Sequence, residues 1–328
     1  MSGHLPSGAI AFIVACAAAS GILVSFTLVV VVPIFAWCVA RMLHDPVERV
    51  DDPRWRAPLA AMAATIPGTS FAIGAVALLV HVARSGCLSL SVGRTVFATL
   101  CALLIALLAR ACLRAIGRMD EAAAFVRMSD AAPRRLAVAA SAIGVRARFL
   151  ASSSPLVVLA GLFSPIVIVS SGALERLSDD ELTAALHHEL AHRRRGDQAL
   201  MWVVAFCGDL SPFGVRSLVE SYRRARELAA DREACRFSQS EELAAAILHL
   251  TTRSSALSAS TVCALNDGHR TEERLRVLLH ESSADVTRTT PLRLLALSGA
   301  IACAILIGFV PAAVALLVSP CTASMRMS

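Results

Sequence analysis

Two histidines and a glutamate stand close together in the run His188-Glu189-Leu190-Ala191-His192. In an α-helix, residues four apart lie on one face, so His188 and His192 could bind one metal ion together. Glu189 lies one position further round, where its carboxylate could act as a general base beside that metal. Two imidazole ligands and a carboxylate base from one helical turn are typical of zinc metallopeptidases. The pattern therefore predicts one zinc ion per chain, provided that the rest of the sequence supplies a third ligand.

A third metal ligand is predicted from the segment Arg226-Glu-Leu-Ala-Ala-Asp-Arg232. Catalytic zinc sites use three protein ligands and leave one position open for water. Glu227 and Asp231 are four apart on a helix predicted from about residue 219 to 237, so Glu227 is placed to bind the metal. Asp231 is placed to accept a hydrogen bond from the far ring nitrogen of a ligand histidine, most simply His188. The alternative is an exposed helix whose acids pair with the adjacent arginines.

The helix that carries the two histidines has clear predicted ends. Ser178 is a good N-cap, Glu181 is placed to complete a capping box, and Gly196 is placed to end the helix. Upstream, residues 156–161 and 166–169 are predicted to form two short strands. We expect the first of them to be an exposed edge to which an extended peptide substrate could add.

Three further residues are candidates for substrate contacts. Val157 and Gly161 lie in the strand predicted to be an exposed edge. Arg274 lies downstream, and the sequence leaves two roles open for it, a substrate contact or a structural ion pair.

Composition favours a membrane protein. Hydrophobic residues make up 56% of the 328 residues, and the mean hydropathy is +0.65. All 31 basic residues are arginine, and the formal net charge is +6. The lack of lysine excludes a Gly-Lys-Ser/Thr phosphate loop, a Schiff-base lysine and an acylated Ser-x-x-Lys site. We interpret the arginines as signals of membrane topology, so membrane lipid is an expected partner and direct binding of nucleic acid is not expected.

Four apolar segments are long enough to cross a bilayer, which needs about 20 residues. They run from about residue 9 to 32, 59 to 82, 96 to 113 and 294 to 318. Arginines gather after the first and the third, which places those loops in the cytoplasm and both termini outside. The first segment is expected to be retained, because it is too long and lacks the basic start of a cleaved signal peptide. Cys87 and Cys321 would then face outside and could form a disulfide.

These features predict a mainly α, multi-pass plasma-membrane protein with about four transmembrane helices. Residues 1–113 would form three membrane helices with their loops. Residues 114–290 would form a cytoplasmic α+β metalloprotease domain inserted between the third and fourth spans. Residues 291–328 would form the fourth span and a short outer tail.

A family resemblance covers about residues 155 to 279. The block from Pro165 to Leu182, the run from His188 to Asp197 and the pair Glu227-x-x-x-Asp231 resemble the membrane gluzincins. Both the BlaR/MecR-type antirepressor peptidases and the HtpX and CAAX-protease family share this layout. Three spans, a cytoplasmic zinc domain and one closing span resemble the BlaR/MecR type more closely. The resemblance implies His188, His192 and Glu227 as zinc ligands and Glu189 as the base.

The sequence also departs from both families. BlaR/MecR sensors continue into an extracellular penicillin-binding domain, whereas this sequence continues only to Ser328 and lacks the lysine of an acylated site. Direct covalent sensing of β-lactams by this polypeptide is therefore not expected. In the other family a His-Pro motif precedes a Glu-Arg-Ile run. Here Glu273-Arg274-Leu275 matches the run, but His269 is followed by Arg270, so we do not expect His269 to stabilise an oxyanion.

Together, these features favour a zinc metalloendopeptidase that acts in signal transduction by cleaving a cytoplasmic protein. A winged-helix DNA-binding repressor of the BlaI/MecI type would be a suitable substrate. One alternative is an HtpX-like protease for quality control of membrane proteins. An alternative of another class is a non-catalytic membrane transducer with a structural zinc ion, which the presence of Glu189 disfavours.

Overall fold

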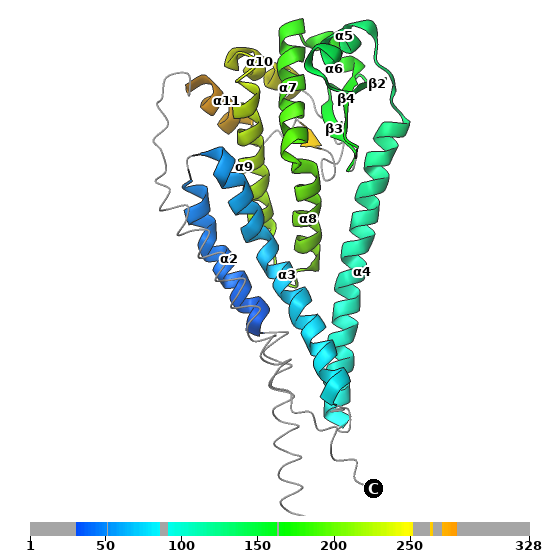
Figure 1. Ribbon diagram of the computed structural model, residues 1–328, viewed down its shortest axis with the longest axis vertical. Coiled ribbons are helices and arrows are strands. Elements are labelled where there is room, and N and C mark those ends of the chain that lie inside the picture. The colour runs from blue at the N-terminus through cyan, green and yellow to red at the C-terminus, as the bar shows by residue number, and fades with distance from the viewer. Residues whose placement is uncertain are drawn as a thin grey trace, which may run out of the picture.

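The computed structural model describes residues 31–50, 52–85, 91–162, 164–251, 263–264 and 271–280. Most of these residues are helical, and a small sheet lies at one end of the molecule, as the sequence predicts (Figure 1). The predicted first and fourth spans lie almost wholly outside the described residues. Cys87, Cys321 and His269 lie outside them too.

Three helices come first in the described chain: α2 (Val32–Glu48), α3 (Pro53–Ser85) and α4 (Ser91–Arg127). They extend away from the domain that holds the sheet, and α3 and α4 converge at their far ends (Figure 1). Among the described residues, one helix segment is long and apolar enough to cross a membrane, Pro53–Leu78 in α3. It overlaps the second predicted span.

The helix α8 (Asp197–Leu210) packs against α3 and α4, although its apolar run is too short to cross a bilayer. The approach to α3 is very close at Gly68. A Cβ atom at that position would lie 2.0 Å from the backbone carbonyl oxygen of Cys207. Only glycine therefore allows the two helix backbones to meet there.

The sheet has the strand order β1-β2-β4-β3-β5. Its strands are β1 (Asp130–Ala131), β2 (Ala147–Leu150), β3 (Val157–Ala160), β4 (Ile166–Ser170) and β5 (Cys263–Ala264). The strand β4 pairs in parallel with β2 and antiparallel with β3. The two strands predicted from the apolar runs correspond to β3 and β4.

The expectation that Val157–Gly161 forms an exposed edge is wrong. The strand β3 lies inside the sheet, where Val158 pairs with Ala264 and Leu159 with Cys263 of β5. All four of its residues are buried. The physical reason is visible in the run Val-Val-Leu-Ala, because a strand that is apolar on both faces lacks the alternation of a half-exposed strand.

The helix α7 (Asp179–Arg195) carries both histidines of the motif, and its ends match the prediction. The Ser178 hydroxyl accepts a hydrogen bond from the Glu181 backbone N–H at 3.2 Å, and the Glu181 carboxylate accepts one from the Ser178 N–H at 2.9 Å. Gly196 ends the helix with a φ of 66°, a left-handed conformation that glycine adopts without strain. The inward face of α7 packs on β3, α5 (Arg134–Ile143) and α10 (Ser240–Thr251).

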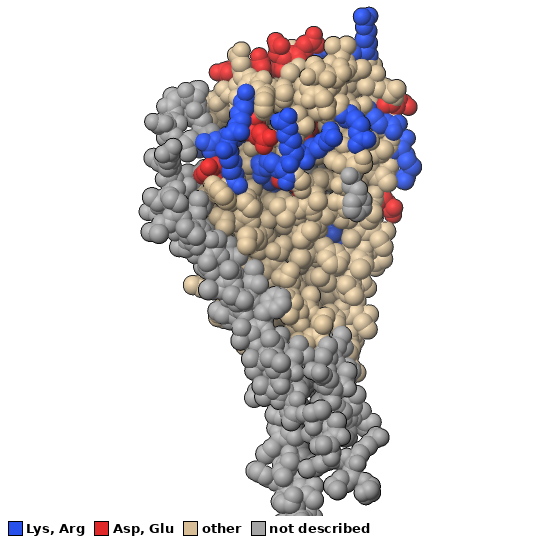
Figure 2. Space-filling model, in the orientation of Figure 1, with Lys and Arg blue, Asp and Glu red and all other residues tan. Residues whose placement is uncertain are grey.

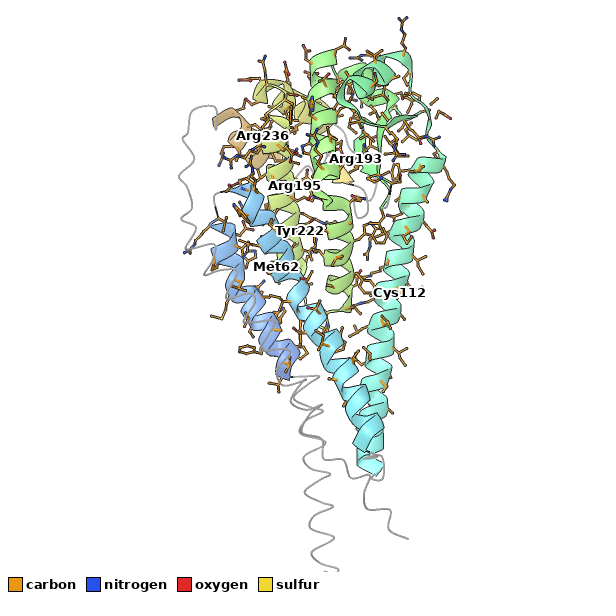
Figure 3. All side chains as sticks on the ribbon, in the orientation of Figure 1. Met62, Cys112, Arg193, Arg195, Tyr222 and Arg236 are labelled. Carbon is orange, nitrogen blue, oxygen red and sulfur yellow. The ribbon has the colours of Figure 1, made fainter. Side chains whose placement is uncertain are left out.

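The helix α9 (Arg216–Ala234) joins two apolar cores. Its C-terminal end packs with α7, while Leu218 and the completely buried Tyr222 pack with α2, α3 and α8. Figure 3 shows Tyr222 and Met62 at the level of these long helices. Above them lie Arg193, Arg195 and Arg236, which belong to the domain that holds the sheet, called the sheet domain below. Because α9 contacts both parts, it fixes the position of the sheet domain on the long helices. The short helices α6 (Ser171–Arg176) and α11 (Thr271–His280) complete the domain.

Candidate metal centre

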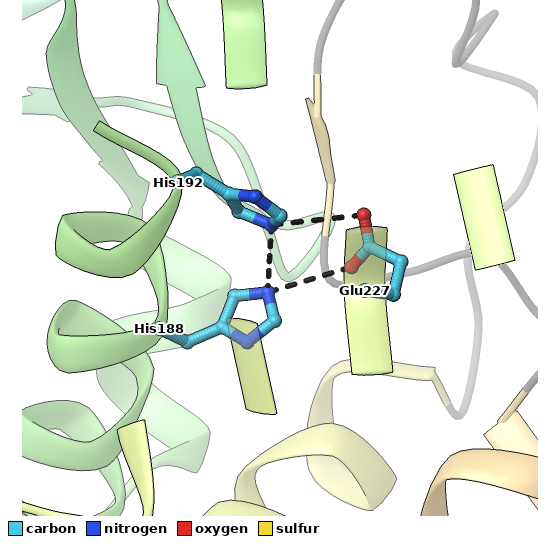
Figure 4. A group of neighbouring side chains, drawn as sticks. All are labelled: His188, His192 and Glu227. Atoms are coloured by element: carbon cyan, nitrogen blue, oxygen red, sulfur yellow. Dashed lines mark hydrogen bonds and ion pairs between the residues drawn. The ribbon is translucent and has the colours of Figure 1, made fainter. Parts of the chain in front are cut away.

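His188, His192 and Glu227 come together between α7 and α9 (Figure 4). The Nε2 atoms of the two histidines are 3.1 Å apart. The Glu227 carboxylate lies 3.4 Å from His188 Nε2 and 3.6 Å from His192 Nε2. All three side chains are buried. The structure therefore brings together the three residues that the sequence assigns as metal ligands.

The spacing of these atoms fits a metal ion. Two nitrogens that bind one tetrahedral zinc ion lie about 3.3 Å apart at usual zinc–nitrogen distances. The Nδ1 atoms of both rings face carboxylates, at 2.9 Å from Asp231 Oδ1 for His188 and 2.8 Å from Asp197 Oδ2 for His192. Those contacts favour the proton on Nδ1, which leaves two Nε2 lone pairs directed at one space. Such an arrangement is repulsive unless a proton or a metal ion lies between the two nitrogens.

The balance of buried charge also fits a divalent cation. Within the described part of the chain, four buried carboxylates and two buried arginines surround the centre. They are Glu189, Asp197, Glu227, Asp231, Arg226 and Arg274. Buried charges are tolerated only when they are balanced. With Glu189 ionised, these six groups carry two more negative than positive charges, and the partly exposed Arg195 lies 3.5 Å from Asp197. A bound cation would offset the remaining negative charge.

Glu189 is completely buried, and neither of its carboxylate oxygens has a hydrogen-bond partner among the described residues. Burial raises its pKa to about 8 from the usual value of 4.5, although the nearby His188 acts in the opposite direction. A cation bound nearby would also lower the pKa of Glu189, because it would favour the ionised carboxylate. A carboxylate with unused acceptor atoms and a pKa near neutrality is suited to general-base chemistry.

Arg274 contacts two carboxylates of the centre, those of Asp231 and Glu227. It donates hydrogen bonds to both Asp231 oxygens, at 2.7 Å from Nε and 2.6 Å from Nη2, and its Nη1 lies 3.5 Å from Glu227. Burial alone would raise the pKa of Asp231, but Arg274 and His188 lower it. Of the two roles that the sequence left open for Arg274, the structure displays the ion pair.

Glu227 is contacted by two arginines and by both histidines. Arg226 donates a hydrogen bond to its Oε1 at 2.8 Å. Burial alone would raise the pKa of Glu227, but His192 and Arg226 hold it well below its usual range. The carboxylate is therefore kept ionised, which a metal ligand requires.

Asp197 is a residue at the centre to which the sequence analysis assigned no role. It is the first residue of α8, and Gly196 turns the chain so that its carboxylate reaches back to His192 Nδ1. The signal in the sequence was an acid directly after the helix-ending glycine. To predict the contact with His192 from this signal, one would have to know the direction in which the chain leaves α7.

Replacing Asp197 with asparagine is expected to weaken metal binding by about 10–100-fold, because this contact orients a ligand histidine and raises its basicity. The measurement is a competition titration with a chromogenic chelator. Asp180→Asn is the matched control, since Asp180 is an exposed acid in the first turn of α7. Equal affinities for the two variants would contradict a supporting role for Asp197.

A buried His-His-Glu group beside the buried carboxylate of Glu189, in a molecule with a long apolar helix, defines a candidate membrane metallopeptidase. Residues 88–278 match the family model described as BlaR1 peptidase M56, so the chain belongs to this family. The resemblance to BlaR/MecR-type peptidases is thereby confirmed. The family consists of membrane metallopeptidases. Neither the curated proteins nor the solved structures contain a match to this chain.

Proposed function

We propose that this protein is a zinc endopeptidase of the plasma membrane that cleaves a cytoplasmic protein during signal transduction. The observation that carries the proposal is the buried group of His188, His192 and Glu227 beside the carboxylate of Glu189, which has no hydrogen-bond partner among the described residues. A structural zinc site is usually closed by four ligands and has no need of a base. Three candidate ligands and a nearby carboxylate that is not among them suit a hydrolytic site better.

The residues of the chain have separate roles in this mechanism. When bound, zinc would supply a Lewis acid at the scissile carbonyl. Glu189 takes a proton from the attacking water on its carboxylate and passes it to the leaving amine. Asp231 and Asp197 hold the imidazoles of His188 and His192 in orientation through their Nδ1 atoms. Burial of the centre limits the water that competes with these contacts.

The proposed topology has four spans, with residues 114–290 in the cytoplasm between the third and fourth spans and both termini outside. The apolar segment of α3 supports the second span. Figure 2 shows a band of arginines across the upper part of one face and a surface almost free of charge below it. Such a band is expected on the cytoplasmic side of a membrane protein, because arginine is enriched there.

A cytoplasmic repressor is the proposed substrate, and a winged-helix DNA-binding protein suits this role. A cytoplasmic domain can reach such a substrate without binding DNA itself. Family membership and the proposed position of the centre support this choice.

The test uses the full-length chain in proteoliposomes, with an unfolded protein and a purified winged-helix repressor as separate substrates. Cleavage of both is expected to stop after treatment with phenanthroline and to return when zinc is added, whereas a serine-protease inhibitor should have no effect. Cleavage that survives complete removal of metal would contradict the metallopeptidase proposal. Cleavage of the unfolded protein alone would contradict only the choice of a repressor.

A further inference from the structure

A second site lies apart from the metal centre, where α4 passes the C-terminal end of α8 and the start of α9. A cavity of about 520 Å³ opens between these helices. Within the described residues its lining includes five arginines, Arg110, Arg114 and Arg118 from α4 and Arg216 and Arg223 from α9. Phe213, Val215 and Val219 form part of its apolar wall. The cavity thus combines a dense positive charge with an apolar surface.

The acids that line the cavity do not balance this charge. Among the described residues they are Asp209 and Glu220, so the lining carries three more positive than negative charges. Asp209 is already bound by Arg114 at 2.6 Å and Arg118 at 2.9 Å. Arg110 donates from Nε to the Asp209 backbone carbonyl at 3.0 Å, which fixes α4 to the end of α8.

Arg118 retains unused hydrogen-bonding capacity. Its Nε and Nη2 atoms are buried and have no hydrogen-bond acceptor in the described part of the chain. The guanidinium lies over the ring of Trp202, 5.7 Å from the ring centroid, which restricts its orientation. A buried donor without an acceptor is unfavourable, so this position favours an added oxygen ligand.

The cavity lies at the level expected for the inner surface of the membrane. Arg110 is nineteen residues after Ser91, the first residue of α4. At about 1.5 Å per residue this is roughly 28 Å, close to the roughly 30 Å hydrocarbon thickness of a bilayer. Below Arg110, the side chains Leu103, Ile105 and Leu108 are 43%, 66% and 46% exposed. Figure 3 places Cys112, which lies among the three α4 arginines, beside the lower part of α8.

From these observations we infer that the cavity binds the phosphate of an anionic phospholipid from the inner leaflet, whose acyl chains lie along the apolar face of α4. Guanidinium groups bind phosphate oxygens in a bidentate manner, and basic pockets on the cytoplasmic side of membrane helices suit anionic headgroups. Arg118, in the inner wall of the cavity, and Arg216, at its exposed rim, are assigned as the residues that contact the phosphate. The inference rests on the proposed membrane placement of α4 and does not depend on peptidase activity.

The test measures retention of phosphatidylglycerol and phosphatidylcholine by the detergent-solubilised full-length chain, using native mass spectrometry. The unsubstituted chain is expected to bind phosphatidylglycerol more tightly than phosphatidylcholine. Arg118→Gln and Arg216→Gln should each weaken phosphatidylglycerol binding by roughly fivefold, the effect of one arginine near an anionic lipid. Arg134→Gln is the matched control, because Arg134 is exposed on α5 and carries the same charge.

Arg216→Gln keeps the test valid if Arg118→Gln fails to fold, since Arg216 is an exposed residue at the first position of α9. Retention of phosphatidylglycerol by Arg216→Gln equal to that by Arg134→Gln would overturn the inference. Binding of inorganic phosphate as tight as that of the lipid would also overturn it, because the ligand would then be a free anion. The inactive Glu189→Gln variant should bind the lipid normally, which separates this result from the fate of the proposed function.

Discussion

Glu189→Gln is expected to lower the rate of peptide-bond hydrolysis by about 10²–10⁴-fold, the usual contribution of a general base. Glutamine has nearly the same shape as glutamate, and it cannot accept the proton. Neither oxygen of Glu189 has a hydrogen-bond partner among the described residues, so the substitution breaks no observed contact. Since it also removes a buried carboxylate, the thermal unfolding midpoint should not fall. Initial rates, metal content and the unfolding midpoint are the measurements.

Glu227→Gln is the matched comparison, because it makes the same chemical change at the candidate ligand. Metal content should fall in Glu227→Gln and stay at the level of the unsubstituted chain in Glu189→Gln. Activity should be lost in both. Full metal content in Glu227→Gln would remove that residue from the ligand set, and an undiminished rate in Glu189→Gln would remove the base.

The features that the sequence predicted well are local in the chain. The capping box of Ser178 and Glu181 depends on residues three apart, and Gly196 ends the helix through its own backbone freedom. The spacing of His188 and His192 needs only the geometry of one helix. Glu227 lies on another helix, and its assignment depended on a pattern typical of such sites rather than on geometry.

The features that the sequence missed depend on contacts between distant segments. Whether β3 is an edge is decided by β5, about a hundred residues later, and the pattern of β3 alone carries no information about that partner. Asp197 reaches His192 only because the left-handed backbone of Gly196 interrupts the helix between them. Similarly, the two roles left open for Arg274 could be distinguished only when α11 was seen to pack beside α9.

The ion pair of Arg274 and Asp231 is expected to have a large effect on stability. Both side chains are buried, and Arg274→Met would leave the Asp231 carboxylate without its two guanidinium hydrogen bonds. Breaking a buried pair by removal of one partner typically lowers the free energy of unfolding by about 3–5 kcal/mol. Metal retention should fall as well, since Asp231 would no longer be held against His188.

Arg276→Met is the matched control for this change. Arg276 lies on the same helix, and its contact with Glu272 is highly exposed, so its loss should change the free energy of unfolding by no more than about 1 kcal/mol. The double variant Asp231→Leu with Arg274→Met should recover part of the stability lost in Arg274→Met, because it no longer buries an unpaired charge. It should not recover metal retention, because His188 would still lack its carboxylate. If Arg274→Met unfolds at the same midpoint as Arg276→Met yet loses activity, Arg274 acts on the substrate rather than on the fold.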